Sequence, residues 1–181
     1  LRGMPLKADT LLPKDYAEWF RELAGHIDRH RGQIAIYEFL NEFNIWRGRS
    51  KNPDPAVYDE PTPDVYAKAV TAFRELLKQH DPKALVAGPA TCGTDVPFTL
   101  NLLRLGAGKS LDLITEHSYR QQPECPDYEE DLKSLMEGAG AYGNFRFAQT
   151  EAGMIKLPQL PDNLIERYGR AKAAWDVRNM L

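Results

Sequence analysis

Two carboxylates in this chain each follow a short apolar run, which is how strand ends present acids for catalysis. Residues 34–46 read IAIYEFLNEFNIW, a strand-like stretch that brings Asn41 and Glu42 to its end. Residues 146–153 read RFAQTEAG and present Glu151 in the same way. If the two acids face each other, one can protonate a leaving oxygen while the other attacks an anomeric carbon or activates water. That is the chemistry of glycosidic bond cleavage.

The segments around these acids alternate between helix and strand patterns. Apolar residues at helical spacing, with glycine or proline stops, predict helices over residues 15–30, 65–79, 98–105, 128–138 and 164–180. Short apolar runs between them predict strands over residues 33–40, 84–88, 111–119 and 145–150. Repeated helix–strand units of this kind imply a parallel sheet with right-handed crossovers.

Four parallel strands cannot close a barrel, and no glycine-rich phosphate loop marks a nucleotide-binding sheet. We therefore predict an α/β fold in which residues 1–181 form one partial domain. It is about half of an eight-stranded (β/α)8 barrel, strands four to seven. Glu42 and Glu151 then lie on strands four and seven at the carboxyl-terminal rim. A half barrel exposes its edges and interior, so we expect the missing half to be required for a closed, stable fold.

The composition of the chain argues against several classes of binding partner. The chain is 43% hydrophobic and 27% charged with a net charge of −3, and no basic cluster suited to nucleic acid appears. No apolar run approaches the roughly 20 residues that span a bilayer. No His, Cys or Asp cluster has metal-ligand spacing, and no cofactor is predicted. Cys92 and Cys125 follow neighbouring predicted strands and are equally compatible with a disulfide and with two free thiols. The chain starts at Leu1, so we expect a trimmed N-terminus, and the compartment stays undetermined.

The motifs resemble those of the clan A glycoside hydrolases, retaining (β/α)8 enzymes with catalytic acids on strands four and seven. The finer pattern is EFLNEFN followed by Trp46, then VAGPAT, then LITEHSY. It is most similar to the β-xylosidase and α-L-iduronidase branch, over nearly the whole chain. Phe43 stands where the family usually has proline, and Ala152 where an aromatic residue is common, which leaves the sugar open.

The resemblance implies a role for each matching residue. Glu42 would be the general acid/base and Glu151 the nucleophile of a double displacement on an oligo- or polysaccharide. Asn41 would bind the 2-hydroxyl group of the sugar. His117 and Tyr119, which share one strand face, would line the sugar site. A further candidate for substrate binding is Trp46, whose indole could stack on a sugar or anchor its loop.

Other readings remain. The chain could be a carbohydrate-binding pseudo-glycosidase that has lost turnover, or a barrel segment that is inactive without its missing half. Glu38 has the strand parity of Glu42, so we expect it to point into the barrel as a hydrogen-bonded structural acid. Glu116 has the opposite parity to His117 and is expected to face the helices.

Overall fold

The computed structural model describes residues 12–45, 60–120 and 126–154 of the 181-residue chain. For residues 119–120, 126–128 and 151–154 it describes the backbone path alone. The helix predicted over residues 164–180, together with Trp46 and Cys125, lies outside the described residues.

The described strands form one parallel sheet. They are β1 (Ile36–Glu38), β2 (Leu85–Cys92), β3 (Leu113–Arg120) and β4 (Arg146–Met154). Their order in the sheet is β1-β2-β3-β4, and each pairs in parallel with the next. The predicted parallel sheet is therefore confirmed, with the strands in chain order.

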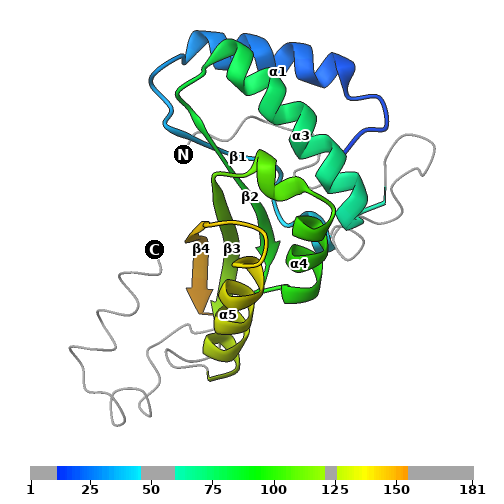
Figure 1. Cartoon of the computed structure of the whole chain (residues 1–181). Helices are drawn as coiled ribbons and strands as arrows, with labels where there is room; N and C mark the ends of the chain where they lie inside the picture. The colour runs from blue at the N-terminus through cyan, green and yellow to red at the C-terminus, as the bar shows by residue number, and fades with distance from the viewer. Residues whose placement is uncertain (1–11, 46–59, 121–125, 155–181) are drawn as a thin grey trace.

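The helices follow one another along the sheet. They are α1 (Ala17–Arg29), α3 (Pro63–His80), α4 (Val96–Arg104) and α5 (Pro126–Ala139). Two 3-10 turns, η1 (Phe43–Ile45) and η2 (Ala107–Ser110), complete the described elements. α1 and α3 lie side by side, α3 contacts α4, and α4 contacts α5 (Figure 1). This layer connects successive strands, as a β/α repeat requires.

The core lies between the sheet and this layer. Phe39, just after β1, stacks on Phe73 of α3 with ring centroids 4.7 Å apart. Tyr66 of α3 is fully buried, and its hydroxyl donates a 2.7 Å hydrogen bond to the carbonyl oxygen of Phe39. A buried phenol needs such a partner, because an unmet hydrogen bond in the core costs about 1–3 kcal/mol. This contact ties the end of β1 to the helix layer.

The face of the sheet opposite the helices is open at β1. Tyr37 packs in the core, whereas its neighbours Ile36 and Glu38 point the other way and are exposed. Glu38 nevertheless contacts β4, the far strand of the sheet: the Thr150 hydroxyl donates a 2.7 Å hydrogen bond to its carboxylate. Two strands separate β1 from β4, so this contact requires a sheet curved about that face. Glu38 thus points to the concave, barrel-interior side, as predicted.

The predicted strand ends need correction. β1 is three residues long rather than the predicted 33–40, because Leu40 (φ 62°) and Glu42 (φ 48°) leave the extended region. Strand parity therefore does not carry from Glu38 to Glu42. β4 continues to Met154, so Glu151 lies within the strand rather than after it.

Candidate active site

Glu42 lies in the turn between β1 and η1 and is completely buried. Its backbone N–H donates a 2.9 Å hydrogen bond to the carbonyl oxygen of Ala90 on β2. Its carboxylate oxygen Oε1 lies 3.2 Å from Nδ1 of His117 on β3, within hydrogen-bonding distance. A buried carboxylate must be hydrogen-bonded or paired, and the His117 ring meets that need.

His117 is also completely buried and connects the two candidate acids. Parallel pairing places it beside Cys92 of β2 on one side and Glu151 of β4 on the other. Adjacent strands lie about 4.8 Å apart, so the backbone of Glu151 is the direct neighbour of His117. The sheet thereby brings the segments carrying Glu42 and Glu151 to one histidine.

The structure describes two of the other predicted residues near this point, Asn41 and the backbone of Tyr119. Asn41 precedes Glu42 and is partly exposed. Tyr119 lies two residues beyond His117 on β3, and its backbone pairs with Gly153. Trp46 lies outside the described residues. Because the side chain of Glu151 is among those not described, the separation of the two carboxyl groups stays a prediction.

Asn44 of η1 fixes the turn that carries Glu42, a role that the sequence interpretation missed. Its Oδ1 accepts a 3.0 Å hydrogen bond from the backbone N–H of Cys92, and its Nδ2 donates to Asp95 Oδ2 at 2.9 Å. Asp95 also caps α4 by accepting from the N–H of Phe98 at 3.0 Å. The one available signal was an asparagine two positions after the Asn-Glu pair.

The carboxyl group of Glu38 is held in its ionised form on the concave face. Partial burial raises its pKa, but hydrogen bonds from His117, Thr115 and Thr150, together with the His117 charge, lower it by more. The resulting pKa lies below its ordinary value, so Glu38 is negatively charged near neutrality. His117 therefore lies near both acids: it contacts Glu42 at 3.2 Å and is close enough to Glu38 to lower the pKa of that carboxyl group.

Backbone strain gathers at the same end of the sheet. Among the described residues, the non-glycine positions with positive φ are Leu40, Glu42 and Ala90 (φ 51°). Each such conformation costs about 1–3 kcal/mol and persists where surrounding contacts enforce it, often at functional sites. All three lie toward the carboxyl ends of β1 and β2, where barrel enzymes keep their active sites.

Two neighbouring residues have structural contacts. Glu116 is buried, and the Thr94 hydroxyl donates to its Oε2 at 3.2 Å, which agrees with the predicted structural role. Cys92 lies partly buried at the end of β2. The predicted alternatives for its pairing with Cys125 are not tested.

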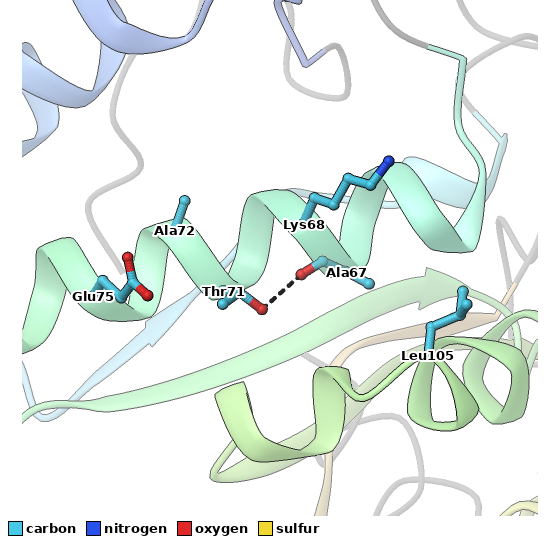
Figure 2. Close-up of a pocket in the computed structure, with 6 residues that line it drawn as sticks. All are labelled: Ala67, Lys68, Thr71, Ala72, Glu75 and Leu105. Atoms are coloured by element: carbon cyan, nitrogen blue, oxygen red, sulfur yellow. Dashed lines mark hydrogen bonds between the residues drawn. The ribbon is translucent and has the colours of Figure 1, made fainter.

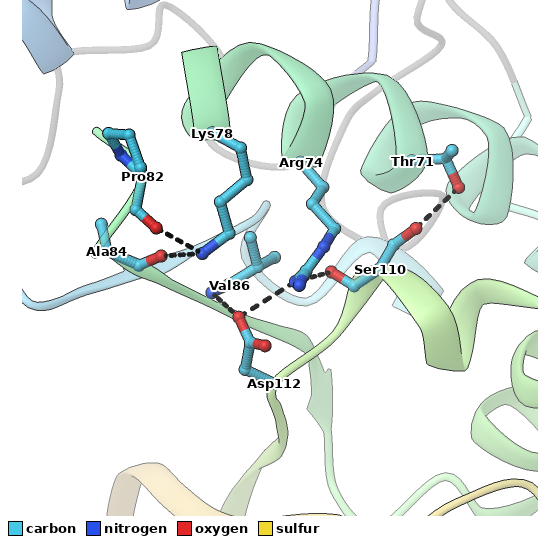
Figure 3. A network of polar contacts seen from close by, with 8 residues as sticks. All are labelled: Thr71, Arg74, Lys78, Pro82, Ala84, Val86, Ser110 and Asp112. Atoms are coloured by element: carbon cyan, nitrogen blue, oxygen red, sulfur yellow. Dashed lines mark hydrogen bonds and ion pairs between the residues drawn. The ribbon is translucent and has the colours of Figure 1, made fainter. Parts of the chain in front are cut away.

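A second polar network lies at the opposite end of the sheet (Figure 3). Arg74 of α3 pairs with Asp112, just before β3, at 3.0 Å. Asp112 also accepts a 2.9 Å hydrogen bond from the N–H of Val86, near the start of β2. Lys78 donates to the carbonyl oxygen of Ala84 at 2.5 Å. These contacts join a helix to the strand starts, the end of a barrel that serves stability.

A shallow hollow on the outer side of α3 contains none of the candidate site residues (Figure 2). It is lined by Ala67, Lys68, Thr71, Ala72, Glu75 and Leu105. The Thr71 hydroxyl donates a 2.8 Å hydrogen bond to the Ala67 carbonyl oxygen of the same helix. The lining offers little chemistry beyond one ammonium and one carboxylate.

Over the described ranges, no helix is both long and apolar enough to cross a membrane. The same ranges contain no group of three or more His, Cys, Asp or Glu side chains placed to hold a metal ion.

No protein-family model matches the sequence, and no curated protein matches it. Solved structures do match. The GH39 enzyme from Xanthomonas axonopodis pv. citri has a TM-score of 0.60 at 18% identity, over 83% of this chain and 34% of that one. A GH39 β-xylosidase from Caulobacter crescentus has a TM-score of 0.55 at 18% identity, over 91% and 36%. Cel44A, a GH family 44 endoglucanase from Clostridium thermocellum, has a TM-score of 0.53 at 15% identity, over 74% and 40%.

These neighbours are glycoside hydrolases, and the chain shares their fold over part of their length. The chain spans 34–40% of each of the three structures. Its four parallel strands and flanking helices correspond to part of a (β/α)8 barrel, which confirms the predicted fold class. At such low identity the likeness concerns the fold, and the chemistry has to be argued from the residues.

Proposed function

We propose that this chain carries the catalytic acids of a retaining O-glycoside hydrolase, with Glu42 as acid/base and Glu151 as nucleophile. The observation that supports this most is the arrangement at His117. Its ring contacts the Glu42 carboxylate at 3.2 Å, and its backbone pairs with Glu151 on the next strand. Two acids brought together at the carboxyl ends of parallel strands suit glycoside hydrolysis.

The reaction then takes two steps. Glu151 attacks the anomeric carbon while Glu42 gives its proton to the leaving glycosidic oxygen, which forms a glycosyl–enzyme ester. Glu42, now a carboxylate, takes a proton from water, and the resulting hydroxide displaces Glu151 from the anomeric carbon. This double displacement retains configuration and requires carboxyl groups about 5 Å apart.

The surrounding residues would bind the sugar. Asn41 adjoins the acid and is partly exposed, so its amide is free to contact a sugar hydroxyl group. Tyr119 and Trp46 are the further candidates for sugar binding. Two of the structural neighbours are named β-xylosidases, which makes aryl β-xylosides the first substrates to try within a wider panel of aryl β-glycosides.

Catalysis by this arrangement would also need the rest of the barrel. Ile36 is 42% exposed on the concave face, and β1 and β4 are the outer strands of the described sheet. Strands one to three and eight would cover both. The isolated 181-residue chain should therefore fail to unfold cooperatively as a monomer, and a sharp monomeric transition in urea would contradict this requirement.

Replacing each acid separately tests the function in the complete barrel. Glu151→Ala should abolish turnover of every substrate because no ester can form. Glu42→Ala should spare aryl glycosides whose leaving group needs no proton, and should lose slow-leaving substrates. Initial rates on activated and unactivated aryl glycosides measure both effects.

Glu130→Ala is the matched control, since Glu130 is an exposed glutamate on α5. It should keep the original rates on both kinds of substrate. Equal loss on both substrates in Glu42→Ala would contradict the acid/base role. Full activity in Glu151→Ala would contradict the nucleophile and the proposed mechanism.

A carbohydrate-binding protein without turnover is the second candidate, and the complete burial of Glu42 favours it. An acid catalyst must reach the glycosidic oxygen, whereas a buried acid against His117 can serve structure alone. Azide separates the two functions. In an enzyme, azide restores turnover to Glu42→Ala by attacking the glycosyl ester and yields a glycosyl azide. A binding protein gives neither turnover nor this product, while retaining affinity for the sugar.

A further inference from the structure

Glu38 joins the two halves of the candidate site through one carboxylate. Its Oε1 accepts a 2.7 Å hydrogen bond from the Thr150 hydroxyl on β4. His117 and Thr115 on β3 lie close enough to the same carboxylate to lower its pKa. Glu38 thus bonds the residue that directly precedes Glu151 and lies near the histidine that contacts Glu42.

Thr150 occupies an irregularity in β4. Pairing between β3 and β4 runs from Glu116 opposite Gln149 to His117 opposite Glu151, so Thr150 is the extra residue between them. A bulge of this kind bends its strand and redirects the next side chain. The bulge lies directly before Glu151 in the chain, and the Glu38 carboxylate holds the side chain of the bulged residue.

His117 lies near a second acid besides Glu42. Glu42 Oε1 lies 3.2 Å from its Nδ1, and the Glu38 carboxylate is close enough for the two groups to interact electrostatically. The negative charge of Glu38 therefore acts on the ring that contacts Glu42, and replacing Glu38 by alanine removes that charge.

We propose that Glu38 is a positioning residue that fixes the β4 bulge through Thr150 and the His117 ring, and so sets the spacing between Glu42 and Glu151. This inference rests on the proposed function. Glu38 touches neither reacting atom in this scheme. Its effect reaches the reaction through the two residues that it holds.

The test replaces Glu38 and Thr150 in the protein with its complete barrel. Glu38→Ala should lower kcat about 10- to 100-fold with little change in KM, because misplaced catalytic groups slow the chemical step more than binding. Thr150→Val, which removes only the donor hydroxyl, should lower kcat in the same direction. Thr150→Ser, unlike Thr150→Val, keeps a hydroxyl group at this position and should therefore keep most of kcat. A purely structural role would instead lower thermal stability without this split between kcat and KM.

Two results would overturn the inference. One is an unchanged kcat in Glu38→Ala and Thr150→Val while Glu42→Ala and Glu151→Ala show their predicted losses; the proposed function would then stand without the positioning role. The other is recovery of Glu38→Ala by azide with a glycosyl azide product, which would make Glu38 itself the acid/base. If Glu38→Ala does not fold, the Thr150→Val and Thr150→Ser pair decides. Full activity in Glu151→Ala would instead remove the proposed function.

Discussion

Charged side chains are buried to different degrees at the two ends of the sheet. Where the strands start, Asp112 bonds Arg74 and the N–H of Val86, and both charged side chains keep some exposure to solvent. Where they end, Glu42 and His117 pair with no exposure at all, beside residues with strained backbone. Strained backbone and a fully buried ionisable pair thus occur together at the strand ends, which supports the proposal that the candidate site lies there.

The largest effect is expected from breaking the pair of Glu42 and His117 at the strand ends. His117→Ala removes the contact to a fully buried Glu42, and breaking a buried pair lowers the free energy of unfolding by about 3–5 kcal/mol. Turnover should fall as well, because the acid loses its orientation. Urea unfolding of the complete barrel and initial rates measure both changes.

His80→Ala is the control at the other end, where His80 contacts Asp28 at 3.0 Å near the surface. That variant should lose about 1 kcal/mol or less and keep its rate. Equal losses in the two variants would remove the contrast between the ends.

The next effect tests the packing that holds β1 to the helices. A methyl group on Gly88 would lie 2.2 Å from the Tyr66 hydroxyl, so Tyr66 must shift and its bond to Phe39 is lost. Gly88→Ala should therefore lower stability by about 1–3 kcal/mol. Gly25→Ala in α1 meets only ordinary contact, 3.5 Å from Arg29 Nη1, and should raise stability by up to about 1 kcal/mol. Thermal unfolding compares the two, and a stable Gly88→Ala would contradict the close packing.

Asn44→Ala should weaken the turn that carries Glu42. Losing the bonds to Cys92 and Asp95 lowers stability by about 1–2 kcal/mol, and turnover should fall about tenfold because Glu42 is less fixed. Asn101→Ala, which loses only an exposed contact with Arg104, should leave both unchanged. Rates that fall in neither variant would show that Asn44 serves stability alone.

The smallest expected effect is a pH-dependent loss of stability at the strand starts. Burial raises the pKa of Asp112, but hydrogen bonds from Val86 and Arg74 and the nearby positive charges lower it below 3.8 overall. Its stabilisation is thus present above pH 3.8 and is lost as pH falls through the lower folded-state pKa. Asp112→Asn should lower stability by about 1 kcal/mol at pH 7, flatten this acid dependence and leave turnover unchanged.

Urea unfolding at pH 7 and pH 3 measures the change in Asp112→Asn. Asp131→Asn, on the exposed side of α5, provides the matched control and should follow the original protein. A loss of turnover in Asp112→Asn would mean that both ends contribute to the chemistry.

The parallel sheet could be predicted from the sequence because apolar runs and helical periodicity are local signals. The end of β1 could not, since the positive φ of Leu40 and Glu42 depends on contacts such as Glu42 with Ala90, far along the chain. The candidate pair of acids, Glu42 and Glu151, was suggested by two apolar runs that each end in a glutamate. The contact of Glu38 with Thr150 joins residues 112 positions apart, and no local pattern encodes it.

The contact between Glu38 and Thr150 also limits how the barrel can be completed. Because it already bridges the outer strands, the four strands carry their curvature within this segment. Strands taken from another protein would have to fit the space between β1 and β4, because widening that space would break the hydrogen bond between Glu38 and Thr150. Shuffled barrels built on this segment should therefore accept donors of matching curvature and reject those that need a flatter sheet.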